Sequence, residues 1–452
     1  MLKRHLILAL NNKGFGESVL GFKLALELQH AGDEVLFLTH NSNLKLFGTR
    51  FPYVAFSDAA APLFRIYFDD CLERFHPSSI ILSDFATTLT FFQSLGWTLE
   101  MVTAFDGPVF AIDTWGLFRV PENDSPPRDG SHSSKLAQSG RAAWGERFGM
   151  VSPLCPVPFL AQGTVPGLYC SLPSTISPDR RIAQRISDSL GLDLASKVVL
   201  FCTSPWQHSA EWQEPTVVRD HMLTRASRAE QMNPAPDDDR ADAGTQWSGA
   251  KRLASSLPGL LADYLSRLGK SVHLLHIGPR PFEIREQLQG RYHWLSSLSH
   301  DKFEALLARA DLLLSANITG TTIAKAMALR VPVVVMHNSI SAASVEEAES
   351  GMGKPLSPAL QTWLKNTVPL SPFSLWPLGY WHFLEPILQN NPYTAALQRV
   401  EILDQERVES TLESLLFNVC AREDQIHRQA CYANQVCSLP SGVELIKAKF
   451  QS

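Results

Sequence analysis

The sequence predicts an α/β protein made of two doubly wound domains. Its 452 residues are too many for one ordinary domain and suit two of roughly 200 residues each. Hydrophobic residues make up 45% of the chain and charged residues 19%, as in globular proteins, so each half can bury a core. Strand-like and helix-like segments alternate through both halves, which is typical of parallel sheets with crossover helices.

The first domain is expected over residues 1–180. Its predicted strands cover residues 5–10, 34–39, 53–56, 79–83 and 108–112. Its predicted helices cover residues 17–30, 62–75 and 88–104. Leu20, Leu24 and Leu28 recur at helical spacing in the first of these helices. Strands separated by helices in this order predict a doubly wound sheet.

The second domain is expected over residues 181–400, followed by a helical tail over 401–452. A helix at 180–190 and a strand at 197–202 restart the alternation after a segment with little periodicity. Further helices are predicted at 251–268 and 301–310, and further strands at 272–277, 292–295, 312–315 and 333–336. Residues 207–249 are rich in Pro, Asp and other turn residues, so we expect an insertion that is mobile at least in part.

Composition argues against several classes of protein. A formal net charge of −5 provides no broad basic field, so a nucleic-acid partner is not expected. The apolar start is too short for a secretory signal, and no stretch reaches the roughly 18 apolar residues of a membrane span. The seven cysteines lack a Cys-x-x-Cys pair, which favours reduced thiols in a cytoplasm. Cys431, Cys437 and His427 match no common zinc spacing, and no metal site is expected.

The strongest local signal lies between Asp311 and Asn338. A predicted strand leads into the polar turn Asn317-Ile-Thr-Gly320, and a helix begins at Thr321 and Thr322. The start of a helix offers backbone N–H groups and the positive end of a dipole, which suit a diphosphate, and Gly320 allows an anion to approach closely. The alternative is that these residues simply cap the helix, since Thr and Asn are ordinary N-cap residues.

This segment resembles the donor-binding segment of the two-domain glycosyltransferases with the GT-B fold. In that family a strand, a small-residue turn, a helix and a "G-x-P-x-V" strand hold the donor pyrophosphate. Here Asn317 to Gly320 replace the usual glycine pair, Arg330 replaces the usual glycine before Val-Pro, and Lys325 stands where many members have a glutamate. The resemblance in element order covers nearly the whole chain.

The resemblance implies a fold and a set of donor-binding residues. The fold is α/β, with two Rossmann-like doubly wound domains facing a central cleft. The donor site is expected to contain residues from four strand ends, namely Thr203, Ser204, Gly278, Arg280, Asn317, Thr319, Gly320, Thr321, Thr322 and Asn338. Arg280 can pair with an anionic oxygen. The turns after the strands at 197–202 and 272–277 are equally compatible with simple strand ends.

The first β-α turn contains Lys13, Gly14 and Gly16. Two glycines permit a tight turn, and Lys13 can reach an anion over the carboxyl edge of the sheet. The third glycine of a dinucleotide fingerprint is missing and no acidic residue closes the second strand, so NAD is not expected. By resemblance this loop faces the cleft between the domains and contacts the acceptor or the donor.

Polar residues follow the strands of the first domain. Asp113 and Asp84 are the first candidates for a base that deprotonates an acceptor hydroxyl, with Glu17 as a third candidate and His40 as a cleft residue. Asp after a strand also caps the next helix, and the helix dipole alone explains Glu17.

These observations predict a glycosyltransferase that moves a sugar from a nucleoside-diphosphate sugar to an unknown acceptor. No cofactor or metal is expected, since a helix end and basic groups can offset the charge of the leaving diphosphate. Two alternatives stay open: a nucleotide-sugar epimerase of the same fold, and a non-catalytic relative that binds a ligand or partner. The aromatic cluster Phe373, Trp376, Tyr380, Trp381 and His382 fits either sugar stacking or core packing.

Overall fold

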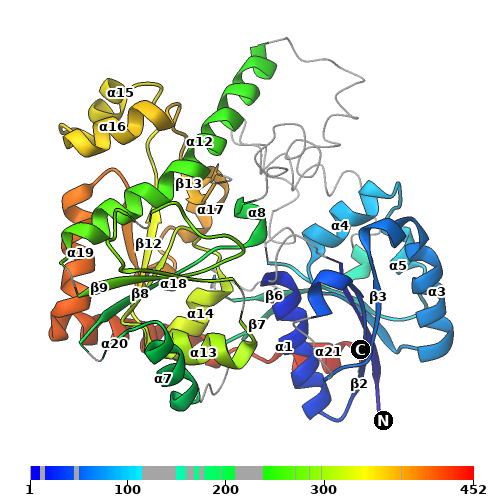
Figure 1. The fold of residues 1–452 in the computed structure, drawn as a ribbon. Coiled ribbons are helices and arrows are strands. Elements are labelled where there is room, and N and C mark those ends of the chain that lie inside the picture. The colour runs from blue at the N-terminus through cyan, green and yellow to red at the C-terminus, as the bar shows by residue number, and fades with distance from the viewer. Residues whose placement is uncertain are drawn as a thin grey trace. The chain divides into compact units, whose positions relative to one another are not determined.

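The structure is a computed structural model that divides into two compact units. Unit 1 comprises Met1–Ser171 and Gln435–Ser452, and unit 2 comprises Leu172–Asn434. The structure describes residues 2–10, 16–44, 50–114, 149–157, 159, 167–172, 178–193, 195–208, 238–269, 271–284, 286–296, 298–377 and 379–451. Each unit is built around its own parallel sheet (Figure 1).

Unit 1 contains a seven-stranded sheet in the order β3-β2-β1-β4-β5-β6-β7. Its strands are β1 (Arg4–Ala9), β2 (Glu34–His40), β3 (Tyr53–Phe56), β4 (Ser79–Leu82), β5 (Val109–Ile112), β6 (Val151–Pro156) and β7 (Leu168–Tyr169). All neighbouring strands are parallel. The first six follow the doubly wound order 3-2-1-4-5-6 of dinucleotide-binding folds.

Both faces of this sheet are covered by helices. They are α1 (Gly16–His30), α3 (Phe64–Phe75), α4 (Phe85–Ser94), α5 (Glu100–Thr103) and α21 (Gly442–Lys449), with the short 3-10 helices η1 (Asn41–Asn43) and η2 (Asp58–Leu63). Alternate residues of β1 point to opposite faces. Leu6 and Leu8 belong to the core that contains residues of α3 and α4, while Ile7 and Ala9 belong to the core that contains residues of α1 and α21. The apolar run of β1 is therefore buried on both sides.

Unit 2 repeats the plan with a six-stranded sheet in the order β10-β9-β8-β11-β12-β15. Its strands are β8 (Lys197–Cys202), β9 (Val272–Ile277), β10 (Tyr292–Leu295), β11 (Leu312–Ser315), β12 (Val333–His337) and β15 (Gln398–Glu401). Numbered along the chain, this is again the order 3-2-1-4-5-6. A small antiparallel sheet pairs β13 (Phe373–Leu375) with β14 (Gly379–Tyr380).

The helices of unit 2 are α7 (Arg180–Ser189), α8 (Pro205–His208), α12 (Asp238–Arg267), α13 (His300–Arg309), α14 (Thr321–Ala328), α15 (Val345–Met352), α16 (Pro358–Thr367), α17 (Trp381–Leu388), α18 (Pro392–Ala395), α19 (Gln405–Phe417) and α20 (Val419–Cys437). Several of them cover the two faces of the sheet, whereas α15 and α16 lie away from it (Figure 1). α12 contacts α16 and α19, and α13 contacts α7 and α14. The predicted fold of two Rossmann-like doubly wound domains is confirmed.

Several element boundaries differ from the predictions. The helix expected over 88–104 is two helices, α4 and α5, because Gly96 turns the chain between them with a φ of 74°. Strands β6, β7, β13, β14 and β15 were not predicted. Of the expected insertion at 207–249, residues 209–237 lie outside the described residues. Residues 238–249 form the first part of α12.

The division into units also differs from the expected domains. The chain divides at Ser171 rather than at 180. The tail is helical as expected, but it does not form one body. Its first part, up to Asn434, belongs to unit 2, and Gln435–Ser452 returns to unit 1.

Candidate functional site

The strand order of unit 2 marks one place on its sheet for a ligand. β8 and β11 are neighbours at the point where the winding direction reverses. In open α/β sheets, ligands bind outside the carboxyl ends of the strands at such a reversal. The segments that follow β8, β9 and β11 at this edge contain most of the residues predicted for donor binding. We call this place the unit 2 edge.

The start of α14 is the central feature of the unit 2 edge. Gly320 is the N-cap residue, with extended backbone and no capping side-chain hydrogen bond. Thr321 and Thr322 are half-buried and lie inside the first turn of the helix. The first N–H groups of a helix have no partner within the helix, and here no side chain caps them. Gly320 therefore caps the helix through its backbone alone, neither threonine is the N-cap residue, and the helix start is suited to an anion.

Three buried polar atoms lie in the segments beside this helix start. β13 runs along the segment after β11, since Ile318 donates its N–H to the Ser374 carbonyl at 3.1 Å and Trp376 donates to Ala316 at 3.0 Å. Within the described part of the chain, Asn317 Oδ1, Ser374 Oγ and Trp376 Nε1 have no hydrogen-bond partner. Buried polar groups nearly always have a partner, so these atoms indicate a place for a ligand atom or water.

A chain of four polar side chains lies under the same edge. Thr203 Oγ1 is 2.7 Å from His276 Nε2 and 2.8 Å from His208 Nε2. His276 Nδ1 is 2.9 Å from the Tyr292 hydroxyl. A Cβ atom at Gly278 would lie 2.0 Å from Thr203 Oγ1, so only glycine at this position allows the contacts. We call Tyr292, His276, Thr203 and His208 the unit 2 relay.

Both histidines of the unit 2 relay are neutral near pH 7. Burial lowers the pKa of His276 to about 3. Burial, together with the charge of Arg280, lowers the pKa of His208 to about 4. The Phe282 ring stacks on His276, with centroids 3.9 Å apart. Arg280 itself is exposed in the turn after β9, where it can reach an anion.

Two other predicted donor residues have structural contacts instead. Asn338 is buried, its Nδ2 donates to the carbonyls of Ile340 and Ser371, and its Oδ1 accepts from the Ile340 amide. Asn338 therefore holds the loop after β12. The Ser204 amide donates to Gln207 Oε1 at 2.7 Å, which closes the first turn of α8. Thr319 is half-buried in the turn before Gly320.

His337 and Glu401 form a further pair at the ends of β12 and β15. They are register partners, and His337 Nε2 lies 3.9 Å from Glu401 Oε2. Burial raises the pKa of Glu401 to about 7 and lowers the pKa of His337 to about 3. Sequence reasoning missed this pair, as it missed His208 and Tyr292. A His at the end of a predicted strand was the available signal for His337.

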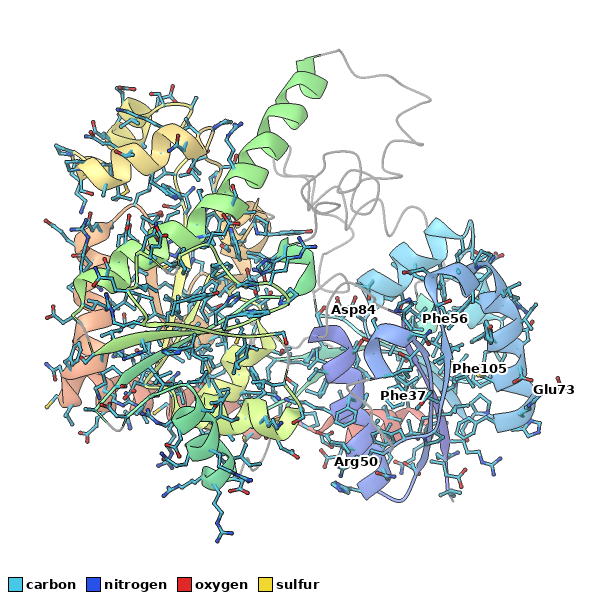
Figure 2. All side chains as sticks on the ribbon, viewed as in Figure 1. Phe37, Arg50, Phe56, Glu73, Asp84 and Phe105 are labelled. Carbon is cyan, nitrogen blue, oxygen red and sulfur yellow. The ribbon has the colours of Figure 1, made fainter. Side chains whose placement is uncertain are left out.

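In unit 1, Asp84 and Asp113 follow the neighbouring strands β4 and β5 at the carboxyl edge of the sheet, and Asp84 is labelled in Figure 2. Asp84 Oδ1 accepts the Thr87 amide at 2.7 Å, and Oδ2 accepts the Thr114 hydroxyl at 2.6 Å. Burial raises the pKa of Asp84, and the charge of Asp113 raises it further. Asp84 therefore caps α4, which is the structural role expected from the sequence as the alternative to catalysis. Asp113 is a buried carboxyl group beside Asp84.

The other predicted residues of unit 1 are less informative. His40 Nδ1 accepts from the Ser42 amide at 3.2 Å and so caps η1, while its Nε2 lies 3.3 Å from Asp58 Oδ1. Gly16 is the first residue of α1, and Glu17 follows it in the helix. Lys13 and Gly14 lie outside the described residues.

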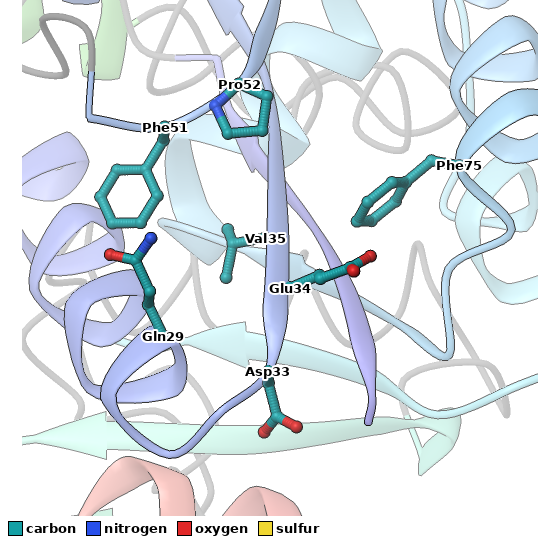
Figure 3. A pocket seen from close by; sticks show the side chains of 7 residues that line it. All are labelled: Gln29, Asp33, Glu34, Val35, Phe51, Pro52 and Phe75. Atoms are coloured by element: carbon teal, nitrogen blue, oxygen red, sulfur yellow. The ribbon is translucent and has the colours of Figure 1, made fainter. Parts of the chain in front are cut away.

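One cavity of unit 1 lies at the other end of its sheet. It has a volume of about 210 Å³ and is lined at the amino end of β2 by Gln29, Asp33, Glu34, Val35, Phe51, Pro52 and Phe75 (Figure 3). Because Asp33 and Glu34 already contact the Lys3 amide and the Arg4 side chain, this cavity is not the candidate site.

The aromatic cluster is divided between core and half-buried positions. Phe373 and Trp376 are in the core of unit 2, as expected if the aromatic residues pack in the core. Tyr380 and Trp381 are half-buried. Among the described residues, no group of three or more His, Cys, Asp or Glu side chains is arranged to hold a metal ion. In the same part of the chain no helix has the length and apolarity needed to cross a membrane.

Several solved structures are similar to this chain at low sequence identity. The calicheamicin glycosyltransferase CalG4 is 12% identical, with 100% of this chain and 98% of that chain covered and a TM-score of 0.47. The glycosyltransferase SnogD from Streptomyces nogalater is 13% identical, with coverage of 100% and 99% and a TM-score of 0.48. A putative UDP-N-acetylglucosamine 2-epimerase from Listeria monocytogenes is 10% identical, with coverage of 97% and 95% and a TM-score of 0.46.

Comparison of sequences alone identifies a family. No curated protein matches the chain. One family model matches residues 24–451, which is nearly the whole sequence. The chain belongs to this family, a family of unknown function (DUF6365).

Proposed function

We propose that this protein is a glycosyltransferase that binds a nucleoside-diphosphate sugar at the unit 2 edge. The observation that carries the proposal is the start of α14, which has no side-chain cap and follows β11 at the reversal of the strand order. A helix start at this position offers N–H groups and a favourable dipole to a diphosphate. The resemblance to the GT-B donor segment supports the same ligand.

The diphosphate contacts proposed here involve three kinds of donor. They are the first N–H groups of α14, the hydroxyls of Thr321 and Thr322, and the guanidinium of Arg280. The two threonines are half-buried and Arg280 is exposed, so all three side chains are accessible at least in part. We propose that transfer needs no metal, because these groups offset the charge that develops on the leaving diphosphate.

We propose Asp113 of unit 1 as the base that deprotonates the acceptor hydroxyl. An inverting transfer needs such a group, and a buried carboxylate suits the task. Asp84 has a structural role, since its two oxygens accept hydrogen bonds from the Thr87 amide and the Thr114 hydroxyl. Its contact with Thr114, the residue after Asp113, supports a role in positioning the end of β5.

The variant Gly320→Asp tests the phosphate site. Gly320 has a φ of −60° and ψ of 125°, which any residue can adopt, and a Cβ there would meet only the Asn317 carbonyl at 3.4 Å. Asp is a good N-cap residue, so the variant should fold while its carboxylate occupies the anion position. We expect calorimetric titration with UDP, GDP and dTDP to show binding by the wild type and none by the variant.

The matched control is Ser357→Asp. Ser357 is the N-cap residue of α16 in the same unit, so this variant adds one negative charge at an equivalent helix position elsewhere. It should bind the nucleotide as the wild type does. Equal binding by Gly320→Asp and Ser357→Asp would contradict the phosphate site.

A milder test uses the double variant Thr321→Val and Thr322→Val. Hydrogen bonds to charged groups are worth about 1.5–3 kcal/mol, so nucleotide affinity should fall by a comparable amount. Incubation of the wild type with nucleotide sugars then identifies the reaction. Slow donor hydrolysis supports transfer, isomerisation of the sugar would support an epimerase, and absence of nucleotide binding would contradict both.

A further inference from the structure

We assign the directions of the hydrogen bonds in the unit 2 relay from the Tyr292 end. The Phe282 amide donates to the Tyr292 oxygen at 2.7 Å, and this bond is buried. A hydroxyl oxygen that accepts one hydrogen bond can still donate its proton, and in this assignment the Tyr292 hydroxyl donates to His276 Nδ1 at 2.9 Å. His276 is neutral, so its single ring proton is then on Nε2. In this assignment Tyr292 sets the tautomer of His276.

The same reasoning extends to His208. His276 Nε2–H donates to Thr203 Oγ1 at 2.7 Å. The single proton of the Thr203 hydroxyl is then available for His208 Nε2 at 2.8 Å. A neutral His208 that accepts at Nε2 has its proton on Nδ1. No residue in the described part of the chain accepts that proton.

We propose that Tyr292, His276 and Thr203 are positioning residues that fix His208 as the Nδ1–H tautomer and direct this donor to an anionic oxygen of the ligand at the unit 2 edge. This inference rests on the proposed function for the identity of the ligand, a phosphoryl group. Thr203, predicted from sequence as a direct donor contact, acts here through His208 because its one proton is already used.

Three features support the relay, and a fourth supports an anionic ligand. The low pKa values of His208 and His276 keep both rings neutral, as the directions require. Gly278 provides the space in which Thr203 and His276 meet. The rings of His208 and Phe282 stack with centroids 5.7 Å apart, which fixes the plane of the His208 ring. Arg280 adds positive charge beside His208, so an anion is the expected ligand.

Nitrogen NMR of the full-length protein with labelled histidine tests the relay without any ligand. The chain has 14 histidines, and the variants His208→Asn and His276→Asn assign the two signals. We expect His276 as the Nε2–H tautomer and His208 as the Nδ1–H tautomer in the wild type and in Thr203→Ser. Valine has nearly the volume of threonine but no hydroxyl. In Thr203→Val, His208 should therefore lose its preference for the Nδ1–H tautomer. An Nε2–H form of His208 in the wild type would overturn the relay.

Titration with inorganic pyrophosphate and with UDP, GDP and dTDP tests the direction of the donor. On binding, the His208 Nδ1–H signal should shift in the wild type and in Thr203→Ser. Affinity should fall by about 10-fold or more in Thr203→Val, given the strength of hydrogen bonds to charged groups. The control Thr362→Val, on the exposed side of α16, should bind as the wild type does.

The outcomes separate the two proposals. Binding that leaves the His208 signal unchanged would overturn the role of His208 while leaving the proposed function in place. A wild type that binds none of these ligands would overturn the proposed function and the role of His208 together. The tautomers of the free protein still decide whether the relay exists.

Discussion

Arg330 adopts a backbone conformation that favours glycine. Its φ is 59°, and it follows the last turn of α14 directly before Val331 and Pro332. The family that the segment resembles has glycine at this position. The conformation expected for that glycine is therefore present although the residue has changed.

Arg330→Gly should stabilise the protein. A left-handed non-glycine residue costs of order 1–3 kcal/mol, and glycine in the unfolded chain costs about 0.5–1 kcal/mol, so the expected change is a net gain of up to about 2.5 kcal/mol. Denaturant unfolding measures the change. Arg185→Gly, at an exposed position inside α7, should instead lose about 1 kcal/mol. A loss of stability in Arg330→Gly would contradict the expected relief of strain.

Asp84→Asn should change how stability depends on pH. Burial raises the folded-state pKa of Asp84, so above the unfolded pKa of about 3.9 the folded protein binds more protons than the unfolded chain. This group therefore lowers stability as pH rises from about 4 to its folded pKa. Asparagine keeps an acceptor for the Thr87 amide and does not titrate.

The measurement is the free energy of unfolding between pH 4 and pH 8. Relative to the wild type, Asp84→Asn should gain stability as pH rises across this range. The exposed Asp106→Asn is the control and should follow the wild type at every pH. If Asp84→Asn also followed the wild type throughout, the buried carboxyl group could not have the raised pKa.

At the scale of elements, a buried ion pair links α13 and α14. Lys325 Nζ lies 3.1 Å from Glu304 Oε1, and the two side chains are 6% and 16% exposed. This lysine stands where the resembling family often has a glutamate. The contact anchors α14 in the orientation that presents its first turn at the unit 2 edge.

Glu304→Gln should be strongly destabilising. It leaves the buried Lys325 ammonium without its carboxylate, and breaking a buried pair costs about 3–5 kcal/mol. The double variant Glu304→Leu and Lys325→Met removes both charges and should recover most of that loss. Chemical denaturation of the wild type and of both variants provides the comparison. Equal stability of Glu304→Gln and the wild type would show that the pair contributes nothing.

How well each strand was predicted follows from where it lies in its sheet. β1, β4, β8, β11 and β12 lie inside the sheets, are apolar on both faces and were found to within two residues. β15 is an edge strand in which only Val400 is buried, so its sequence lacks the apolar run that marked the others. β6 contains two prolines, which favour a loop in sequence reasoning.

The candidate site was predictable only where it is local in sequence. The turn and helix start at 317–322 form one continuous signal. His276 and Tyr292 lie on β9 and β10, Thr203 directly follows β8, and the register of these neighbouring strands brings the three residues together. Spacing along the chain gives no indication of that register, so Tyr292 and His208 were missed.

At the scale of the whole molecule, the chain ends by returning to the unit in which it began. α21 packs on α1, and Ile446 is 1% exposed in the same core as Leu24 and Leu28. Ile446→Ala should destabilise unit 1 by about 2–5 kcal/mol, as for other buried large-to-small changes. Thermal unfolding measures this loss. The half-buried Leu445→Ala should lose less, and equal losses would contradict the packing described.

The central claim is that the start of α14 binds a nucleoside diphosphate. Amide NMR of the whole protein during titration with UDP, GDP and dTDP measures this directly. We expect the amide signals of Thr321 and Thr322 to show the largest shifts with at least one nucleotide. Binding that leaves those two amides unchanged, or no binding of any of the three nucleotides, would contradict the claim.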